Sequence, residues 1–102
     1  MAVNTEKILS YIGLAMKAGK LASGEFMTEK MVKSGKAFLV IVAEDASENT
    51  RKMFTNMCEF YKVPICFLAN KEILGHRLGK KLRASCAVTE KGLAEAILKN
   101  IE

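Results

Sequence analysis

One uninterrupted apolar run, at residues 38–43 (FLVIVA), constrains the fold of this 102-residue chain more than any other feature. The run is too short for a typical helix, is β-branched at its centre and shows no polar alternation. A strand of this pattern is covered on both faces, as in sheets that carry helices on each side. We therefore expect residues 38–43 to form the central strand of such a sheet.

The residues before this strand show the spacing of apolar residues that is typical of two helices. A first helix is expected between a capping residue, Asn4 or Thr5, and the stop at Gly19. A second is expected between Ser23 or Gly24 and Gly35, directly after a tight glycine-bearing turn. The residues expected to face the core are Ile8, Tyr11, Ile12, Ala15 and Met16 in the first helix and Met27, Met31 and Val32 in the second.

Further elements alternate along the rest of the chain. Asp45 and Glu48 fit a capping box for a third helix, which Pro64 would end. Asn70 would cap a short helix through Leu78, and Thr89 would cap the last helix. Inner residues would be Met53, Phe54, Met57, Cys58 and Tyr61 in the third helix and Leu93, Ala94, Ile97 and Ile101 in the last.

Three more segments, residues 20–23, 63–68 and 84–88, fit strands, and we expect the second to be buried like the central one. Strands that alternate with helices form crossover units. We therefore expect an α/β fold, a three-layer α/β/α sandwich around a small, about four-stranded, mixed or largely parallel sheet. Residues 1–102 are expected to form a single domain.

The cysteines favour a reducing compartment and no metal. Cys58, Cys66 and Cys86 form no CxxC pair and lie among apolar neighbours, and His76 is remote from each of them. The start of the chain lacks the pattern of a secretion signal, and no apolar run approaches the length of a membrane span. We expect a cytoplasmic protein with free, buried thiols, no membrane association and no cofactor.

Catalytic patterns are missing from the sequence. No glycine-rich phosphate loop follows a strand, and His76 has no serine, cysteine or carboxylate at motif spacing. Glu44 and Asp45, at the end of the central strand, are the best acid pair, but a helix cap and a solvated side chain explain them more simply. We expect a protein that is not an enzyme.

The net positive charge of the chain instead favours a polyanion as the binding partner. The chain has 16 Lys and Arg against 11 Asp and Glu, a net charge of +5. The basic residues form two clusters, and the alternative is that these are two solvated faces. The first cluster is Lys17, Lys20, Lys30, Lys33 and Lys36, and the second is Lys71, Arg77, Lys80, Lys81 and Arg83.

The start of the second helix also suits a phosphate. A helix that begins at Gly24 offers free backbone N–H groups and the positive end of its dipole, with Lys30 and Lys33 further along. Glu25 would repel a phosphate, but a carboxylate can accept hydrogen bonds from the exocyclic amines of bases. The mixed signs therefore fit a site that contacts base edges as well as backbone.

Three motifs carry a resemblance to a known family: AGKLASGE, SGKAFLVIVAEDAS and LGHRLGKK. With them, almost the whole chain resembles the L7Ae/L30e family of ribosomal proteins, most closely its bacterial YlxQ-like members. The resemblance implies an α/β/α sandwich that binds structured RNA, typically kink-turns or related internal loops. Ribosomal RNA is a candidate partner, and we expect a monomer.

The resemblance also implies where RNA would bind. The corresponding residues here are Gly24, Glu25, Phe26, Met27 and Lys30, then Glu44 and Asp45, then Leu82, Arg83, Ala84 and Ser85. Charge adds Lys20, Lys33, Lys80 and Lys81 to this predicted RNA-binding set.

The chain departs from the family's strongest kink-turn signature at two positions, because it has Phe26 and Met27 where that signature has Asn and Glu. Either the RNA is another element or Glu25 and Thr28 partly substitute for the missing polar groups. We expect Phe26 and Met27 to be core residues rather than surfaces for base stacking. The alternative function is a protein-interaction adaptor that keeps the fold without binding RNA.

Overall fold

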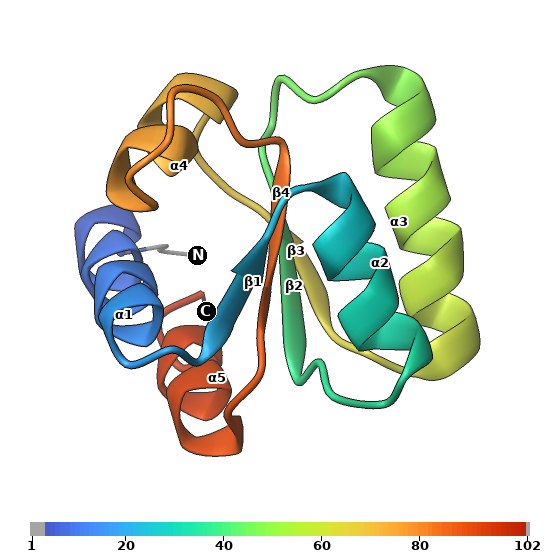
Figure 1. Cartoon of the computed structure of the whole chain (residues 1–102), viewed down its shortest axis with the longest axis horizontal. Helices are drawn as coiled ribbons and strands as arrows, with labels where there is room; N and C mark the ends of the chain where they lie inside the picture. Colours follow the sequence, from blue (N-terminus) through green and yellow to red (C-terminus); the bar gives the residue numbers. More distant parts are fainter. Residues whose placement is uncertain (1–3, 102) are drawn as a thin grey trace.

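A mixed sheet lies at the centre of the molecule (Figure 1). The computed structural model describes residues 4–101, and the domain limits expected at residues 1 and 102 lie outside them. In the described range the elements are α1 (Thr5–Lys17), β1 (Leu21–Ser23), α2 (Glu25–Lys33), β2 (Leu39–Val42), α3 (Glu48–Tyr61), β3 (Ile65–Phe67), α4 (Lys71–Arg77), β4 (Ser85–Val88) and α5 (Lys91–Leu98).

The strand directions bring several loops to one edge of the sheet. Within residues 4–101 the sheet has four strands in the order β1-β4-β2-β3. β2 is parallel to β3, and β4 is antiparallel to both of its neighbours, β1 and β2. The carboxyl ends of β1, β2 and β3 therefore meet the amino end of β4 at the same edge, at the top of Figure 1. We call this the upper edge.

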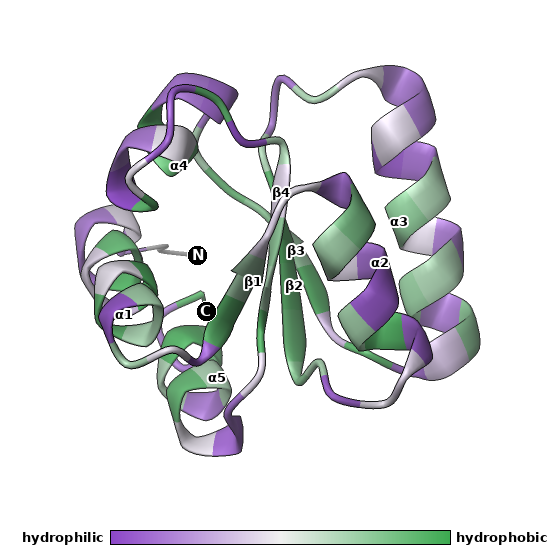
Figure 2. Cartoon of the chain, viewed as in Figure 1, coloured by the Kyte–Doolittle hydropathy of each residue, from purple (hydrophilic) through white to green (hydrophobic). Residues whose placement is uncertain are grey.

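Helices cover both faces of the sheet, which confirms the three-layer prediction. α1, α4 and α5 lie on one face, and α2 and α3 lie on the other (Figure 1). All residues of β2 are buried, as predicted, and β4 is buried beside it, but Phe38, the first residue of the predicted run, precedes the strand and is exposed. Figure 2 shows hydrophobic residues concentrated in the sheet and hydrophilic ones on the outer sides of the helices.

Two helix caps differ from the sequence predictions, and a third is one of the two residues expected. Gly24, rather than Ser23, is the cap residue of α2, and Glu90, not Thr89, caps α5 by accepting from the backbone N–H of Leu93. α3 begins after Ser47, whose hydroxyl accepts from Thr50, so the predicted capping box at Asp45 was wrong. The caps predicted at Asn4 and Asn70 are confirmed.

Several residues predicted to lie in the core are exposed. Phe26 and Met27 lie on the outside of α2, with 75% and 38% of their surfaces accessible. α2 instead buries Thr28 and Val32, one turn apart. Met16 and Tyr61 are also exposed.

The edge position of β3 corrects a further prediction. β3 has only one neighbouring strand, so it is partly exposed and is not covered like β2. In the part of the chain from residue 4 to residue 101, no helix is both long and apolar enough to cross a membrane.

Candidate functional site

Four loops meet at the upper edge of the sheet. They follow β1 (residues 23–24), β2 (residues 44–45) and β3 (residues 69–71), and the fourth precedes β4 (residues 82–84). The strand directions bring them together, although up to 60 residues separate hydrogen-bonded partners among them. We call these residues the loop cluster.

Backbone hydrogen bonds join neighbouring loops, one pair after another, in the order of the strands across the sheet. The N–H of Gly24 donates to the carbonyl of Ser85 over 3.0 Å, and the N–H of Ala43 donates to Ala84 over 2.8 Å. The N–H of Glu44 then donates to Ala69 over 2.9 Å. The loop cluster is thus an extension of the sheet's own ladder, which fixes the positions of its side chains.

Side chains add a second set of connections. The carboxylate of Asp45 accepts a 2.8 Å hydrogen bond from the backbone N–H of Lys71, so it secures the start of α4 rather than the start of α3. The carbonyl of Lys71 accepts from the N–H of Arg83 over 3.0 Å. The guanidinium of Arg83 donates to the hydroxyl of Ser23 over 3.3 Å. These contacts connect all four loops.

Below the surface, Thr28 and Ser85 anchor α2 to β4. They are the buried polar side chains among residues 4–101, and the hydroxyl of Ser85 donates to that of Thr28 over 3.4 Å. Since an unpaired buried hydroxyl is costly, this contact favours one placement of the first turns of α2 over the sheet.

The start of α2 is open to a ligand. Gly24 adopts φ 93°, a conformation that favours glycine, and no side chain caps the helix. The backbone N–H groups of the first turn therefore remain available, next to Arg83, whose Nε lies 3.8 Å from where a Cβ on Gly24 would be. Glu25 adds a carboxylate beside them.

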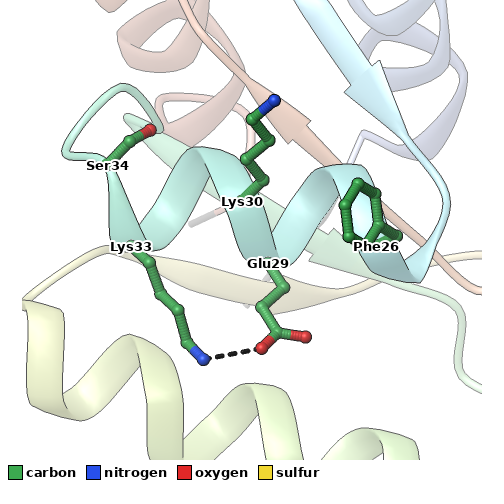
Figure 3. A pocket seen from close by; sticks show the side chains of 5 residues that line it. All are labelled: Phe26, Glu29, Lys30, Lys33 and Ser34. Atoms are coloured by element: carbon green, nitrogen blue, oxygen red, sulfur yellow. Dashed lines mark hydrogen bonds and ion pairs between the residues drawn. The ribbon is translucent and has the colours of Figure 1, made fainter.

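The outer face of α2 carries a shallow hollow (Figure 3). Phe26, Glu29, Lys30, Lys33 and Ser34 line it. The ammonium of Lys33 contacts the Glu29 carboxylate at 2.6 Å, and this hydrogen bond and charge raise the pKa of Lys33. Figure 3 shows that the pair turns toward α3, whereas Lys30 extends away from it.

A close helix–loop contact positions the loop that precedes β4. Gly75 in α4 is buried, and a Cβ there would lie 2.7 Å from the carbonyl oxygen of Lys81 and 2.8 Å from the nitrogen of Leu82. The N–H of Lys80 also donates to the carbonyl of Gly75 over 2.8 Å. Only glycine permits this approach, which presents Lys80, Lys81 and Leu82 beside Glu72 and His76 in a second hollow.

The structure brings together most, but not all, of the predicted site residues. Gly24, Glu44, Asp45, Arg83, Ala84 and Ser85 lie in or against the loop cluster, with Glu25, Phe26, Met27 and Lys30 on the adjoining turns of α2 and Lys80, Lys81 and Leu82 on the adjoining loop. Lys20 lies at the opposite edge, where its carbonyl accepts from Thr89. Lys33 lies at the far end of α2, paired with Glu29.

Four residues that organise the cluster were not in the predicted RNA-binding set: Ser23, Thr28, Lys71 and Gly75. The side-chain or backbone partners of Ser23, Thr28 and Lys71 are distant in sequence, so no local motif marks these residues. Thr28 lies four residues before Val32, which was predicted to face the core, and this helical spacing indicates that both residues share the buried face of α2. For Gly75 the signal was a glycine within a helical segment, which often has a packing reason.

The three thiols carry raised pKa values. Burial raises the pKa of Cys58 to about 11 and of Cys66 to about 12, and it also raises the pKa of Cys86. All three are free cysteines, as predicted, but only Cys58 and Cys86 are fully buried, whereas Cys66 is half-buried. Among residues 4–101, no group of three His, Cys, Asp or Glu side chains could hold a metal ion.

Comparisons with known proteins match most of this chain. A family model described as the ribosomal protein L7Ae/L30e/S12e/Gadd45 family matches residues 6–98. RNA-binding protein YlxQ of Bacillus subtilis (strain 168) is 40% identical over 87 residues, 85% of this chain and 87% of its own length. RNA-binding protein YlxQ of Enterococcus faecium is 37% identical over 99 residues, 97% of this chain and 95% of its own.

Solved structures share the fold. A Bacillus halodurans C protein of unknown function superposes with a TM-score of 0.87 at 33% identity, covering 91% of this chain and 94% of its own. The Giardia lamblia 15.5kD RNA binding protein superposes with a TM-score of 0.84 at 23% identity, covering 98% and 91%. At that identity the second likeness concerns the fold alone.

Proposed function

Because this chain belongs to the ribosomal protein L7Ae/L30e/S12e/Gadd45 family, we propose that it binds structured RNA through the loop cluster and catalyses no reaction. Two relatives that align over most of their length, the YlxQ proteins of Bacillus subtilis and Enterococcus faecium, are named RNA-binding proteins. Their names support the same role here.

The observation that carries the proposal is the set of connected loops at the upper edge. A rigid surface that combines exposed backbone N–H groups, cations and carboxylates can contact phosphates and base edges at the same time. The first turn of α2 supplies N–H groups, Arg83 and Lys71 supply positive charge, and the exposed Glu44 supplies an acceptor. Lys80 and Lys81 extend the positive charge along the adjoining loop.

In finer terms, we propose that the ligand is a kink-turn or a related internal loop. Carboxylates such as Glu44 and Glu25 suit the exocyclic amines of unpaired or non-canonically paired bases, which a regular A-form helix does not present in an accessible groove. Ribosomal RNA is the candidate partner, and the protein would act as a cytoplasmic monomer. The free thiols support a reducing location.

The test is the salt dependence of binding to a kink-turn RNA hairpin and to a plain duplex. With about four phosphate contacts, log affinity should fall with log salt at a slope of roughly −3 to −4. Neutralising Lys80 and Lys81 together should make this slope shallower. Neutralising Lys91 and Lys99, two exposed lysines at α5, is the matched control and should change it less.

A flat salt response of both RNAs would contradict RNA binding and favour the protein-interaction adaptor. One feature gives that alternative a specific site. Phe60, 77% exposed, and Tyr61 form an edge-to-face pair at the end of α3, with ring centroids 4.9 Å apart. An exposed aromatic pair of this kind can dock a protein.

A further inference from the structure

Phe26 exposes its ring to solvent on the first turns of α2. It is 75% exposed, and only Phe60 matches it among the large apolar side chains of residues 4–101. No packing role in the fold explains an aromatic ring in this position, because α2 buries Thr28 and Val32 instead. The ring is therefore available for an intermolecular contact.

The charge next to Phe26 restricts what that contact can be. Lys30 lies one turn along the same outer face, in the hollow that both side chains line (Figure 3). The Glu29 carboxylate forms an ion pair with the ammonium of Lys33 at 2.6 Å. The ammonium of Lys30 forms no ion pair within residues 4–101. An aromatic face with an uncommitted cation beside it complements a partner that carries both a flat π surface and negative charge.

Phe26 also adjoins the loop cluster directly. It follows Gly24, where α2 begins, by two residues, and the guanidinium of Arg83 lies against that glycine. RNA held at the cluster would therefore have its chain within reach of the ring. A nucleotide is the partner that supplies a flat base and a phosphate together.

We infer that Phe26 is a stacking platform for one unpaired base of the bound RNA, and that Lys30 contacts the phosphate beside that base. This inference rests on the proposed function and makes it more specific. It implies that the protein selects RNA in which a nucleotide is turned out of the helix next to the start of α2. A fully paired duplex cannot satisfy it.

The experiment measures affinity of the full chain for a kink-turn RNA hairpin, using four variants. Phe26→Ala should weaken binding about tenfold, toward the lower end of the range for one stacked base, and Phe26→Leu should weaken it similarly because leucine has no π face. Phe26→Tyr should bind like the parent. Phe60→Ala, which removes an equally exposed ring elsewhere, should also bind like the parent.

The RNA side of the experiment identifies the base. Each unpaired nucleotide of the hairpin is replaced in turn by an abasic residue. At the stacked position the parent should lose about tenfold, whereas Phe26→Ala should lose almost nothing further, because both changes remove the same contact.

The outcomes separate this inference from the proposed function. Salt-dependent RNA binding that is equal in the parent, Phe26→Ala and Phe26→Leu would overturn the stacking role and leave RNA binding in place. Full affinity in Phe26→Leu with a loss in Phe26→Ala would show an apolar contact, which also overturns stacking. No salt-dependent binding of any RNA by the parent would overturn both.

Discussion

The hydroxyl of Ser85 donates a 3.4 Å hydrogen bond to the hydroxyl of Thr28, and both side chains are fully buried between α2 and the sheet. Ser85 is the first residue of β4, and its carbonyl accepts a second hydrogen bond, from the backbone N–H of Gly24 at the start of α2. Two bonds from one residue thus hold the start of α2, where both the proposed RNA site and the stacking platform lie.

Removing both hydroxyls of this pair should cost less than the sum of the costs of removing each one alone. Thr28→Val and Ser85→Ala should each destabilise the protein by about 1 to 3 kcal/mol, because each leaves a buried hydroxyl unpaired. The double variant should cost less than the sum, since no unpaired group remains. Urea unfolding measures the free energies. Ser10→Ala, at an exposed hydroxyl bonded to its own helix, is the control and should change stability by less than about 0.5 kcal/mol.

A second pair of substitutions tests the contact between α4 and the basic loop. Gly75→Ala would place a methyl group 2.7 Å from the carbonyl oxygen of Lys81, so backbone must shift. We expect a loss of about 1 to 3 kcal/mol in stability, as for overpacking, and weaker RNA binding because Lys80 and Lys81 move. Circular dichroism on unfolding and a binding titration measure the two effects.

Gly13→Ala is the matched control, because Gly13 lies inside α1 and a Cβ there meets nothing within 4 Å. It should stabilise the protein by about 0.5 to 1 kcal/mol, the usual preference of a helix interior for alanine. Equal effects of the two substitutions on RNA affinity would contradict the positioning role of Gly75.

The buried thiols predict how stability changes at alkaline pH. Burial raises the pKa of Cys66 from 9.0 to about 12, so the folded protein retains a proton that the unfolded chain loses. The stability from this thiol is complete below pH 9 and decreases as the pH rises from there through the folded value.

Cys66→Ala should therefore make the decline between roughly pH 9 and 11 shallower, by up to about 1.4 kcal/mol per pH unit for one titrating group. Urea unfolding of parent and variant at matched pH values cancels the contribution of lysine titration. Parallel curves for the two proteins would contradict a raised thiol pKa at this position.

The sequence predicted the elements that depend on local patterns. The four residues of β2 are buried, and Asn4 and Asn70 cap the helices expected of them, because a short apolar run and a helix cap are patterns of a few residues. The prediction of which residues of α2 face the core was partly wrong. Thr28 is polar, and its burial depends on a partner 57 residues away.

The sequence predicted which segments of the chain form the candidate site, but it did not predict which residues contact one another there. Asp45 was expected to cap α3, but it accepts from Lys71, which only the parallel pairing of β2 with β3 brings near. Lys20 is close to Gly24 in sequence, but a strand advances about 3.3 Å per residue. The length of β1 therefore carries Lys20 to the opposite edge of the sheet.

Lys30 should contribute to RNA binding without contributing to the fold. Lys30→Ala should weaken binding by about 1 to 2 kcal/mol, as expected for one charge-assisted contact, because its side chain is exposed and forms no ion pair within residues 4–101. Thermal stability should be unchanged. Lys99→Ala at the end of α5 is the control, and an equal loss of affinity there would indicate a general charge effect instead of a site at α2.

The last prediction concerns the two positions at which the chain departs from the kink-turn signature. Phe26→Asn combined with Met27→Glu supplies an amide and a carboxylate on the first turns of α2. Both replaced side chains are exposed, so the double variant should fold like the parent. It should tighten binding to a kink-turn hairpin, because each good base contact contributes roughly 1 to 3 kcal/mol of discrimination.

The gain should be specific to the paired substitution and to the kink-turn. Phe26→Asn alone removes the stacking ring and supplies only one polar group, so it should not improve binding. Phe60→Asn, at an equally exposed phenylalanine on α3, should leave affinity unchanged. Plain duplex RNA should bind no better than before, since it presents no accessible base edges at this surface. A folded double variant that prefers the kink-turn over duplex no more than Phe26→Asn alone does would contradict a base-edge contact at the start of α2.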